Sequence, residues 1–279
     1  MTIRFSPIVP ARTRSHGGTF SLKAVDLQDL AEAASAVTVL DDFRVRGQPF
    51  APHPHAGFSA VTYVFEDSAG SLRSRDSLGN DVVVGPGGLV WTQAGNGVVH
   101  HEVPADDREL HGLQLFVNLS AKNKLIEPRM LRLQREDVPE WRDDAGDRVR
   151  IVVGSFEDRL SPLVPAEPFT LLDVQLRRGL SFDLPAAHNA LLYLVTGAVA
   201  LRAGRGEQKM AGGHAIAVHG GGGQLWIEAL APSQLIFLSG PDMNDPMVVD
   251  GPFIMSDPAQ IEASYARYEA GKMGRLAPL

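Results

Sequence analysis

The stretch PHPHAGFSAVTYVFED, residues 52–67, joins a histidine pair to a run of β-branched and aromatic residues. Such residues favour strands, and Gly57 and Gly70 bound the run. The stretch DVVVGPGGLVWTQAGNG (81–97) predicts a strand, a turn at residues 85–88, a second strand and a turn at residues 95–97. LHGLQLFVNL (110–119) predicts a further strand. Strands at this spacing indicate a small antiparallel barrel or sandwich.

The second half of the chain also contains short apolar stretches typical of strands. Its strand-like stretches are DRVRIVVG, FTLLDVQLRRG, NALLYLVTGAVALRAG, HAIAVHGGGGQLWIEA and SQLIFLSG. The charged stretch before them lacks the two-residue alternation of strands. We therefore predict an all-β protein with a first barrel at residues 1–125, a linker at 126–147 and a second barrel at 148–279.

The last part of the chain predicts a helix, in SDPAQIEASYARYEAGKMG (256–274). Asp257 suits the N-cap and Pro258 the first helical position. Ile261, Tyr265 and Tyr268 then share one face. We expect this C-terminal helix to lie against one of the barrels.

Composition excludes several classes of function. Among 279 residues, 33 acidic residues outnumber 26 basic ones, so the basic surface of a nucleic-acid binder is not expected. The sequence has no cysteine, which excludes disulfides, thiolate metal sites and cysteine nucleophiles. No apolar run suits a signal peptide or a membrane span. We therefore expect a cytoplasmic protein without membrane contact, and a monomer, because two barrels can cover each other's edges.

Two short motifs predict a metal site. In a strand, residues two apart point to the same face, so His53 and His55 project together, as do His100 and Glu102 in GVVHHEVP (97–104). If the two segments are neighbours in the first barrel, three imidazoles and one carboxylate converge. This sulfur-free set suits one divalent Fe, Mn, Ni, Co, Cu or Zn ion. A lone His-x-His pair is more typical of a surface turn or of hydrogen-bonded histidines, but a His-x-His and a His-x-Glu pair, both in strand context, favour the metal site.

The order of these motifs resembles the pirin family of the cupin superfamily. The matching pieces are PHPHAGF (52–58), VTYVFE (61–66), RDSLGN (75–80), VGPGGLVW (84–91), QAGNGVVHHE (93–102), HGLQLFVNL (111–119) and GPFIMS (251–256). The resemblance implies a bicupin, with two tandem cupin β-barrels and a metal in the N-terminal barrel only. It places the ligands on the same residues, His53, His55, His100 and Glu102, and implies iron as the usual metal.

The resemblance leaves two functions open. Some family members resemble quercetin 2,3-dioxygenases, which open a flavonol ring with O2, and this reading implies a small aromatic substrate with Glu102 as the catalytic base. Others are non-enzymatic, metal-binding regulators of a protein partner. The chain has Ala56, Ser59 and Ser74 where the family often has arginine or glutamate, glutamate, and histidine. These departures favour metal binding over substrate handling.

Overall fold

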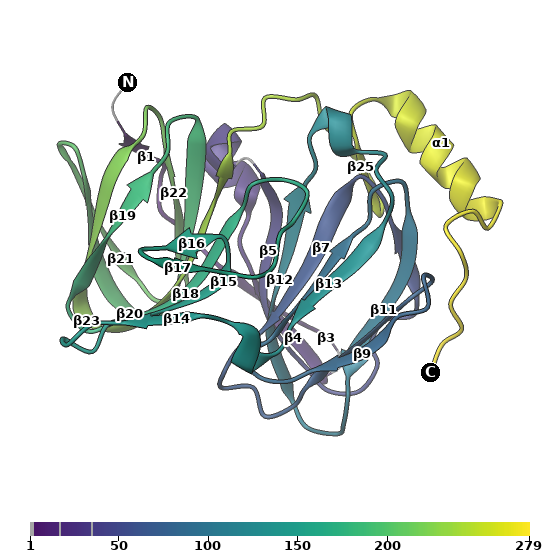
Figure 1. The fold of residues 1–279 in the computed structure, drawn as a ribbon, viewed down its shortest axis with the longest axis horizontal. Helices are drawn as coiled ribbons and strands as arrows, with labels where there is room; N and C mark the ends of the chain where they lie inside the picture. Colours follow the sequence, from purple (N-terminus) through teal and green to yellow (C-terminus); the bar gives the residue numbers. More distant parts are fainter. Residues whose placement is uncertain (1–2, 17, 35) are drawn as a thin grey trace.

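Two β-barrels lie side by side, and an α-helix sits on the outer side of the N-terminal barrel (Figure 1). The computed structural model describes residues 3–16, 18–34 and 36–279. The predicted all-β fold with two tandem barrels and a C-terminal helix is confirmed. Within the described ranges, no helix has both the length and the apolar character needed to cross a bilayer.

The N-terminal barrel consists of a seven-stranded and a four-stranded antiparallel sheet. The predicted strands around residues 59–67, 89–93 and 110–119 are at its centre, because their side chains are buried on both faces. The larger sheet runs in the order β13 (Arg129–Leu133), β10 (Leu89–Gln93), β7 (Phe58–Val64), β12 (Leu110–Asn118), β5 (Val37–Val45), β4 (Phe20–Ala24) and β3 (Arg12–His16). The smaller sheet runs in the order β6 (His53–His55), β11 (Val98–Pro104), β8 (Leu72–Asp76) and β9 (Asp81–Val84).

The C-terminal barrel is a single ten-stranded sheet. Its main path is β1 (Arg4–Phe5), β22 (His214–His219), β20 (His188–Ala203), β23 (Gly223–Pro241), β18 (Thr170–Leu176), β15 (Arg148–Val153) and β14 (Glu140–Arg142). Three further strands pair with members of this path: β2 (Val9–Pro10) with β22, β19 (Gly179–Leu184) with β23, and β21 (Gly206–Ala211) with β20. The remaining elements are β16 (Ser155–Phe156), β17 (Arg159–Leu160), β24 (Val248–Asp250), β25 (Phe253–Met255), η1 (Leu27–Ala34), η2 (Ala121–Asn123), η3 (Arg135–Asp137) and α1 (Pro258–Glu269).

Strand pairing crosses the predicted domain boundaries at both ends of the chain. Strands β1 and β2 pair with β22 of the second barrel, whereas Phe253 of β25 forms a bridge with Ala56 of the first. The stretch 126–147 contains β13, which pairs with β10, and β14, which pairs with β15. Both are edge strands, so charged side chains interrupt their apolar pattern. The boundaries at residues 125 and 147 stay predictions.

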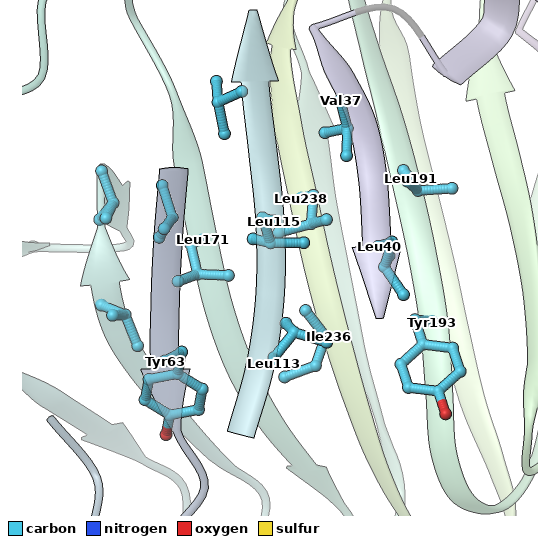
Figure 2. Packing of buried hydrophobic residues seen from close by; sticks show 14 of the residues in the cluster. Val37, Leu40, Tyr63, Leu113, Leu115, Leu171, Leu191, Tyr193, Ile236 and Leu238 are labelled. Carbon is cyan, nitrogen blue, oxygen red and sulfur yellow. The ribbon is translucent and has the colours of Figure 1, made fainter. Parts of the chain in front are cut away.

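An apolar layer joins the two barrels face to face. Figure 2 shows Leu113 and Leu115 of β12 among Leu171, Ile236 and Leu238 of the C-terminal barrel. All five side chains are fully buried. Because side chains alternate along a strand, the residues between them on β12 point the other way, into the first barrel.

The interiors of the two barrels differ. The C-terminal barrel is filled by apolar side chains, and Phe182 stacks on Phe237 with ring centroids 4.7 Å apart. The apolar cluster inside the N-terminal barrel is smaller, with Phe43, Val64 and Leu110 among its members. The cavity that holds the predicted site residues lies in the N-terminal barrel.

Helix α1 covers part of the N-terminal barrel. The Gln260 backbone N–H donates to the Asp257 carboxylate at 2.8 Å, which confirms the predicted N-cap with Pro258 behind it. Ile261 is buried against β25, and the Tyr265 ring meets Phe253 edge-on with centroids 4.9 Å apart. Tyr268 is 40% exposed, so the buried face is narrower than predicted.

A buried polar network crosses the layer between the barrels. The Tyr63 hydroxyl donates to Asp173 at 2.8 Å and accepts from Arg150 at 2.9 Å. Gln234 also donates to Asp173, and Arg150 donates to the Gly87 carbonyl oxygen. Burial raises the pKa of Asp173, while the Gln234 and Tyr63 hydrogen bonds and the Arg150 charge oppose that shift. The Asp173 carboxylate is therefore stabilised mainly by its partners.

We expect Arg150→Met to lower the free energy of unfolding by about 3–5 kcal/mol, because it leaves a buried carboxylate without its countercharge. Guanidinium denaturation followed by circular dichroism measures the change. The matched control is Arg159→Met on β17, a side chain 54% exposed, for which we expect a change within about 0.5 kcal/mol. A loss below about 1 kcal/mol in Arg150→Met would contradict this account.

Candidate metal centre

Strands β6 and β11 bring the predicted histidines together. The two strands are antiparallel, and His100 pairs directly with His53. His55 lies two residues along β6 and therefore on the same face. Strand β6 is at the edge of its sheet, where the missing N–H of Pro54 costs no ladder hydrogen bond.

The three imidazole rings form one compact cluster. Their centroids are 4.7–4.8 Å apart, and their ligand atoms lie within 4.8 Å of one another. His53 Nδ1 lies 2.9 Å from the Ala51 carbonyl oxygen, and His55 Nδ1 lies 3.3 Å from that of Pro252. Each Nδ1 therefore carries a proton, which leaves Nε2 of both rings with a free lone pair. His53 Nε2 and His100 Nε2 are 3.2 Å apart.

Burial favours the neutral, metal-binding form of His55 and His100. Burial, and then the charge of His53, lowers the pKa of His55 to about 3. Burial lowers the pKa of His100 well below its usual value, and the neighbouring histidines lower it further. His53 Nε2 and His100 Nε2 lie close enough to bind the same ion. Three converging imidazole nitrogens suit one divalent transition metal.

Glu102, the predicted fourth ligand and base, faces the same cavity but lies outside the compact group of three histidines. Its carboxylate accepts hydrogen bonds from the Thr62 hydroxyl at 2.6 Å and the Ser74 hydroxyl at 3.2 Å. Burial raises the pKa of Glu102, and these two hydrogen bonds oppose that shift. Its assignments as ligand and base stay predictions.

The cluster opens onto a cavity of about 340 Å³ inside the N-terminal barrel. Phe50, which is 49% exposed, stands at its edge with its ring 5.1 Å from that of Phe20. His101 points away from the cluster as alternation predicts, but it is buried, and its Nε2 lies 2.9 Å from the Phe50 carbonyl oxygen. The lining residues are Phe20, Leu22, Asp41, Phe43, Val45, Pro49, Phe50, His53, His55, Leu72, His100, Glu102, Val103, Pro104, Leu110, Gln114 and Phe116.

Three polar residues of this site were not predicted from the sequence. Asp41 and Gln114 line the cavity, and Thr62 bonds to Glu102. The sequence gives one indication of this: alternation along β5 places Asp41 on the same face as the apolar Phe43. A single sequence does not tell which face of a doubly buried strand points inward.

The three departures from the family pattern have separate surroundings. Ala56 is buried in the apolar cluster beneath α1, with Val99 and Phe253. Ser59 shares the face of β7 that carries Val61 and Tyr63 toward the second barrel, so it points away from the cavity. Ser74 is the one that touches the site, through its hydrogen bond to Glu102.

Residues from the end of the chain support the histidine segment. The Pro252 carbonyl oxygen accepts from His55, and Ile254 N–H donates to the Ala56 carbonyl oxygen at 3.1 Å. Lys124 is fully buried, and its ammonium donates to the carbonyl oxygens of Gly57 and Ile254, each at 2.9 Å. Burial lowers the pKa of Lys124 to about 8.

Two tandem β-barrels with a histidine cluster inside the first define a bicupin protein. Residues 6–117 match the family model described as Pirin, and residues 171–274 match the model of the pirin C-terminal cupin domain. The chain belongs to the pirin family.

Three known proteins illustrate this relationship. The chain is 35% identical over 242 residues to a pirin-like protein of Solanum lycopersicum, covering 85% of this chain and 81% of the relative. It is 33% identical over 231 residues to a Pseudomonas aeruginosa protein provisionally called a quercetin 2,3-dioxygenase, covering 80% and 79%. The crystal structure of a quercetin 2,3-dioxygenase from Acinetobacter baumannii has the same fold, with a TM-score of 0.86, 22% identity and coverage of 98% and 99%.

We expect His100→Ala to lose the bound metal, because it removes one of three converging donors and opens the buried site to water. Elemental analysis after loading with Fe(II), Ni(II) or Zn(II) and dialysis measures the metal per chain. His214→Ala on β22 of the second barrel is the matched control and should keep one equivalent. Retention of a full equivalent by a folded His100→Ala variant would contradict the site.

Proposed function

We propose that this protein is a metal-dependent dioxygenase that opens a flavonol-type aromatic substrate with O2. The observation that carries the proposal is the cluster of three imidazoles on the wall of a largely apolar cavity that also holds Glu102. The provisional name of the P. aeruginosa relative supports the same substrate class. When bound, a divalent transition metal would supply the Lewis acidity and redox chemistry that such a reaction needs.

His53, His55 and His100 would hold the metal, with Glu102 as the fourth ligand when its carboxylate turns toward the cluster. We propose Fe(II) as the resident ion, on the family resemblance. The donor set also accepts Mn, Ni, Co, Cu or Zn, since all are divalent ions that bind imidazole nitrogen and carboxylate oxygen. We further propose a cytoplasmic monomer, because the apolar faces of the two barrels already cover each other.

Glu102 would act as the base that takes a proton from a substrate hydroxyl. Burial raises its pKa, which makes the carboxylate a better proton acceptor near neutral pH. Once protonated, Glu102 can donate to the Thr62 oxygen, because Thr62 Oγ1 is 2.6 Å from Oε2. The single Thr62 proton can then turn to Gln114 Oε1, at 3.0 Å. Both protonation states of Glu102 therefore keep their hydrogen bonds satisfied.

The apolar wall would orient and desolvate the substrate. Phe43, Leu72 and Phe116 line the cavity beside the cluster, and Phe116 lies with its ring centroid 5.3 Å from that of His55. A flat aromatic molecule gains by burying its faces against such side chains. Exclusion of water also strengthens the electrostatic interactions at Glu102 and the histidines.

Protein loaded with Fe(II) should consume O2 in the presence of quercetin, with parallel loss of the flavonol absorbance. We expect Glu102→Gln to keep the metal and to lower kcat by roughly 10²–10⁴-fold, since it removes the proton acceptor. The matched control is Glu136→Gln, at an exposed position of η3, which should retain wild-type turnover. Unchanged turnover in Glu102→Gln would rule out the assigned base.

We expect Thr62→Val to move the acid limb of the kcat/KM profile upward by roughly one pH unit. The Thr62 hydrogen bond lowers the pKa of Glu102, so its removal raises that pKa and the carboxylate becomes a base only at higher pH. Thr92→Val is the matched control, because Thr92 is also fully buried and its hydroxyl has no partner among the described residues. A profile that does not move in Thr62→Val contradicts the coupling of the two residues.

The alternative function is a metal-binding regulatory protein that acts on a protein partner without catalysis. It predicts one metal per chain and no O2 uptake with any flavonol. The mainly apolar lining of the cavity favours the enzyme, since a metal with a purely structural function needs no substrate-sized space beside it.

A further inference from the structure

Asp41 stands out in the cavity, because it is a carboxyl group in a mainly apolar wall. It shares the inner face of β5 with Phe43 and Val45, and all three line the cavity. The next residue, Asp42, points to the opposite face and accepts a hydrogen bond from Tyr193 of the second barrel at 2.9 Å. The two adjacent acids therefore serve different environments, and only Asp41 faces the metal site.

Asp41 ends a row of polar side chains that crosses the barrel from Glu102. Gln114 on β12 pairs with Asp41 on β5 and, on its other side, with Thr62 on β7. Thr62 in turn bonds to Glu102. Side chains of directly paired residues lie on the same face of a sheet. Two strand spacings separate Asp41 from Thr62, which is about 10 Å.

Asp41 differs from the other members of this row in having no hydrogen-bond partner among the described residues. Glu102, Thr62 and Gln114 are joined by hydrogen bonds, whereas none of the residues that the structure describes forms a hydrogen bond with the Asp41 carboxyl group. Burial raises its pKa to about 6, and the Arg14 charge opposes that shift. A poorly solvated carboxylate without a partner costs stability, so a ligand that donates a hydrogen bond to it is stabilised.

We propose that Asp41 is a specificity-determining residue that accepts a hydrogen bond from a remote hydroxyl of the substrate. The ligand class is a planar, polyhydroxylated aromatic molecule of at least two rings. One end would lie at the histidines and Glu102, and a remote hydroxyl would reach Asp41, whose backbone is about 10 Å from that of Thr62. This inference rests on the proposed function, because it places the reacting end of the ligand at the histidine cluster.

The test measures binding without turnover, by titrating metal-loaded protein with two flavonols under nitrogen and following tryptophan fluorescence. Quercetin and 3-hydroxyflavone share the hydroxyl and carbonyl groups of the reacting end, but 3-hydroxyflavone lacks all remote hydroxyls. We expect the wild type to bind quercetin more tightly. Asp41→Ala should weaken quercetin binding about 10-fold or more and leave 3-hydroxyflavone binding unchanged. Asp41→Asn, which keeps an acceptor oxygen, should restore part of the loss, and Asp144→Ala, at an exposed loop position, should behave as wild type.

A second measurement separates this function from a structural one. The pKa of Asp41 is raised in the folded protein, so its charge disfavours folding above about pH 6 and has no effect well below the usual pKa of 3.8. Asp41→Asn should therefore raise Tm at pH 8, and this gain should vanish near pH 4. A Tm lowered by the same amount at both pH values would show a structural residue and overturn the proposal.

The outcomes distinguish the inference from the proposed function. If Asp41→Ala keeps the wild-type preference for quercetin, the specificity assignment is wrong, whether or not O2 is consumed. If the preference depends on Asp41 but no flavonol supports O2 uptake, the ligand class is supported and the dioxygenase function is not. Equal binding of both flavonols to the wild type overturns the inference directly.

Discussion

The apolar layer between the two barrels is the constraint on which the rest of the structure depends. It seals one face of β5, β7 and β12 against the second barrel through residues such as Leu113 and Leu115. The polar side chains of the site can then lie only on the opposite face of these three strands, which lines the first barrel. A shift of β12 by one residue would bury Gln114 in that layer and turn leucines into the cavity. The register that joins the barrels therefore also places the polar row of the site. The filled C-terminal barrel acts as the support for this arrangement.

Buried polar groups in this protein fall into two kinds. Between the barrels, Asp173 has partners in Tyr63 and Gln234, and Asp42 has partners in His111 and Tyr193. Such saturated groups fix how the barrels meet, and nothing remains for a ligand to satisfy. In the cavity, the histidine nitrogens converge, and the Asp41 carboxyl group has no hydrogen-bond donor among the described residues. Polar groups that folding leaves without a partner are available to a ligand, and these lie in the cavity of the N-terminal barrel.

The sequence predicts the local parts of this structure and misses those that depend on tertiary contacts. Alternation along a strand predicted that His53 and His55 share a face, and antiparallel pairing of β6 with β11 placed His100 opposite them. The N-cap of α1 was readable because capping is a local signal. The position of Asp41 in the cavity could not be predicted, because both faces of β5 are largely buried and the sequence pattern does not indicate which face lines the cavity. The crossing of the termini onto the opposite barrels also depends on contacts remote in sequence.

The same remote contacts explain how a short edge strand can hold a metal site. Strand β6 has three residues, one of them proline, so its own ladder constrains His55 weakly. The missing support comes from residues near 254, which return from the second barrel and run beside Ala56. The Lys124 ammonium joins the two segments, and its three donors are all used, by Gly57, Ile254 and Asn118. An N-terminal barrel without this returning segment would lose the acceptor for His55 and one of the three acceptors for Lys124. The histidine cluster thus lies in one barrel but is held in place by residues from both halves of the chain.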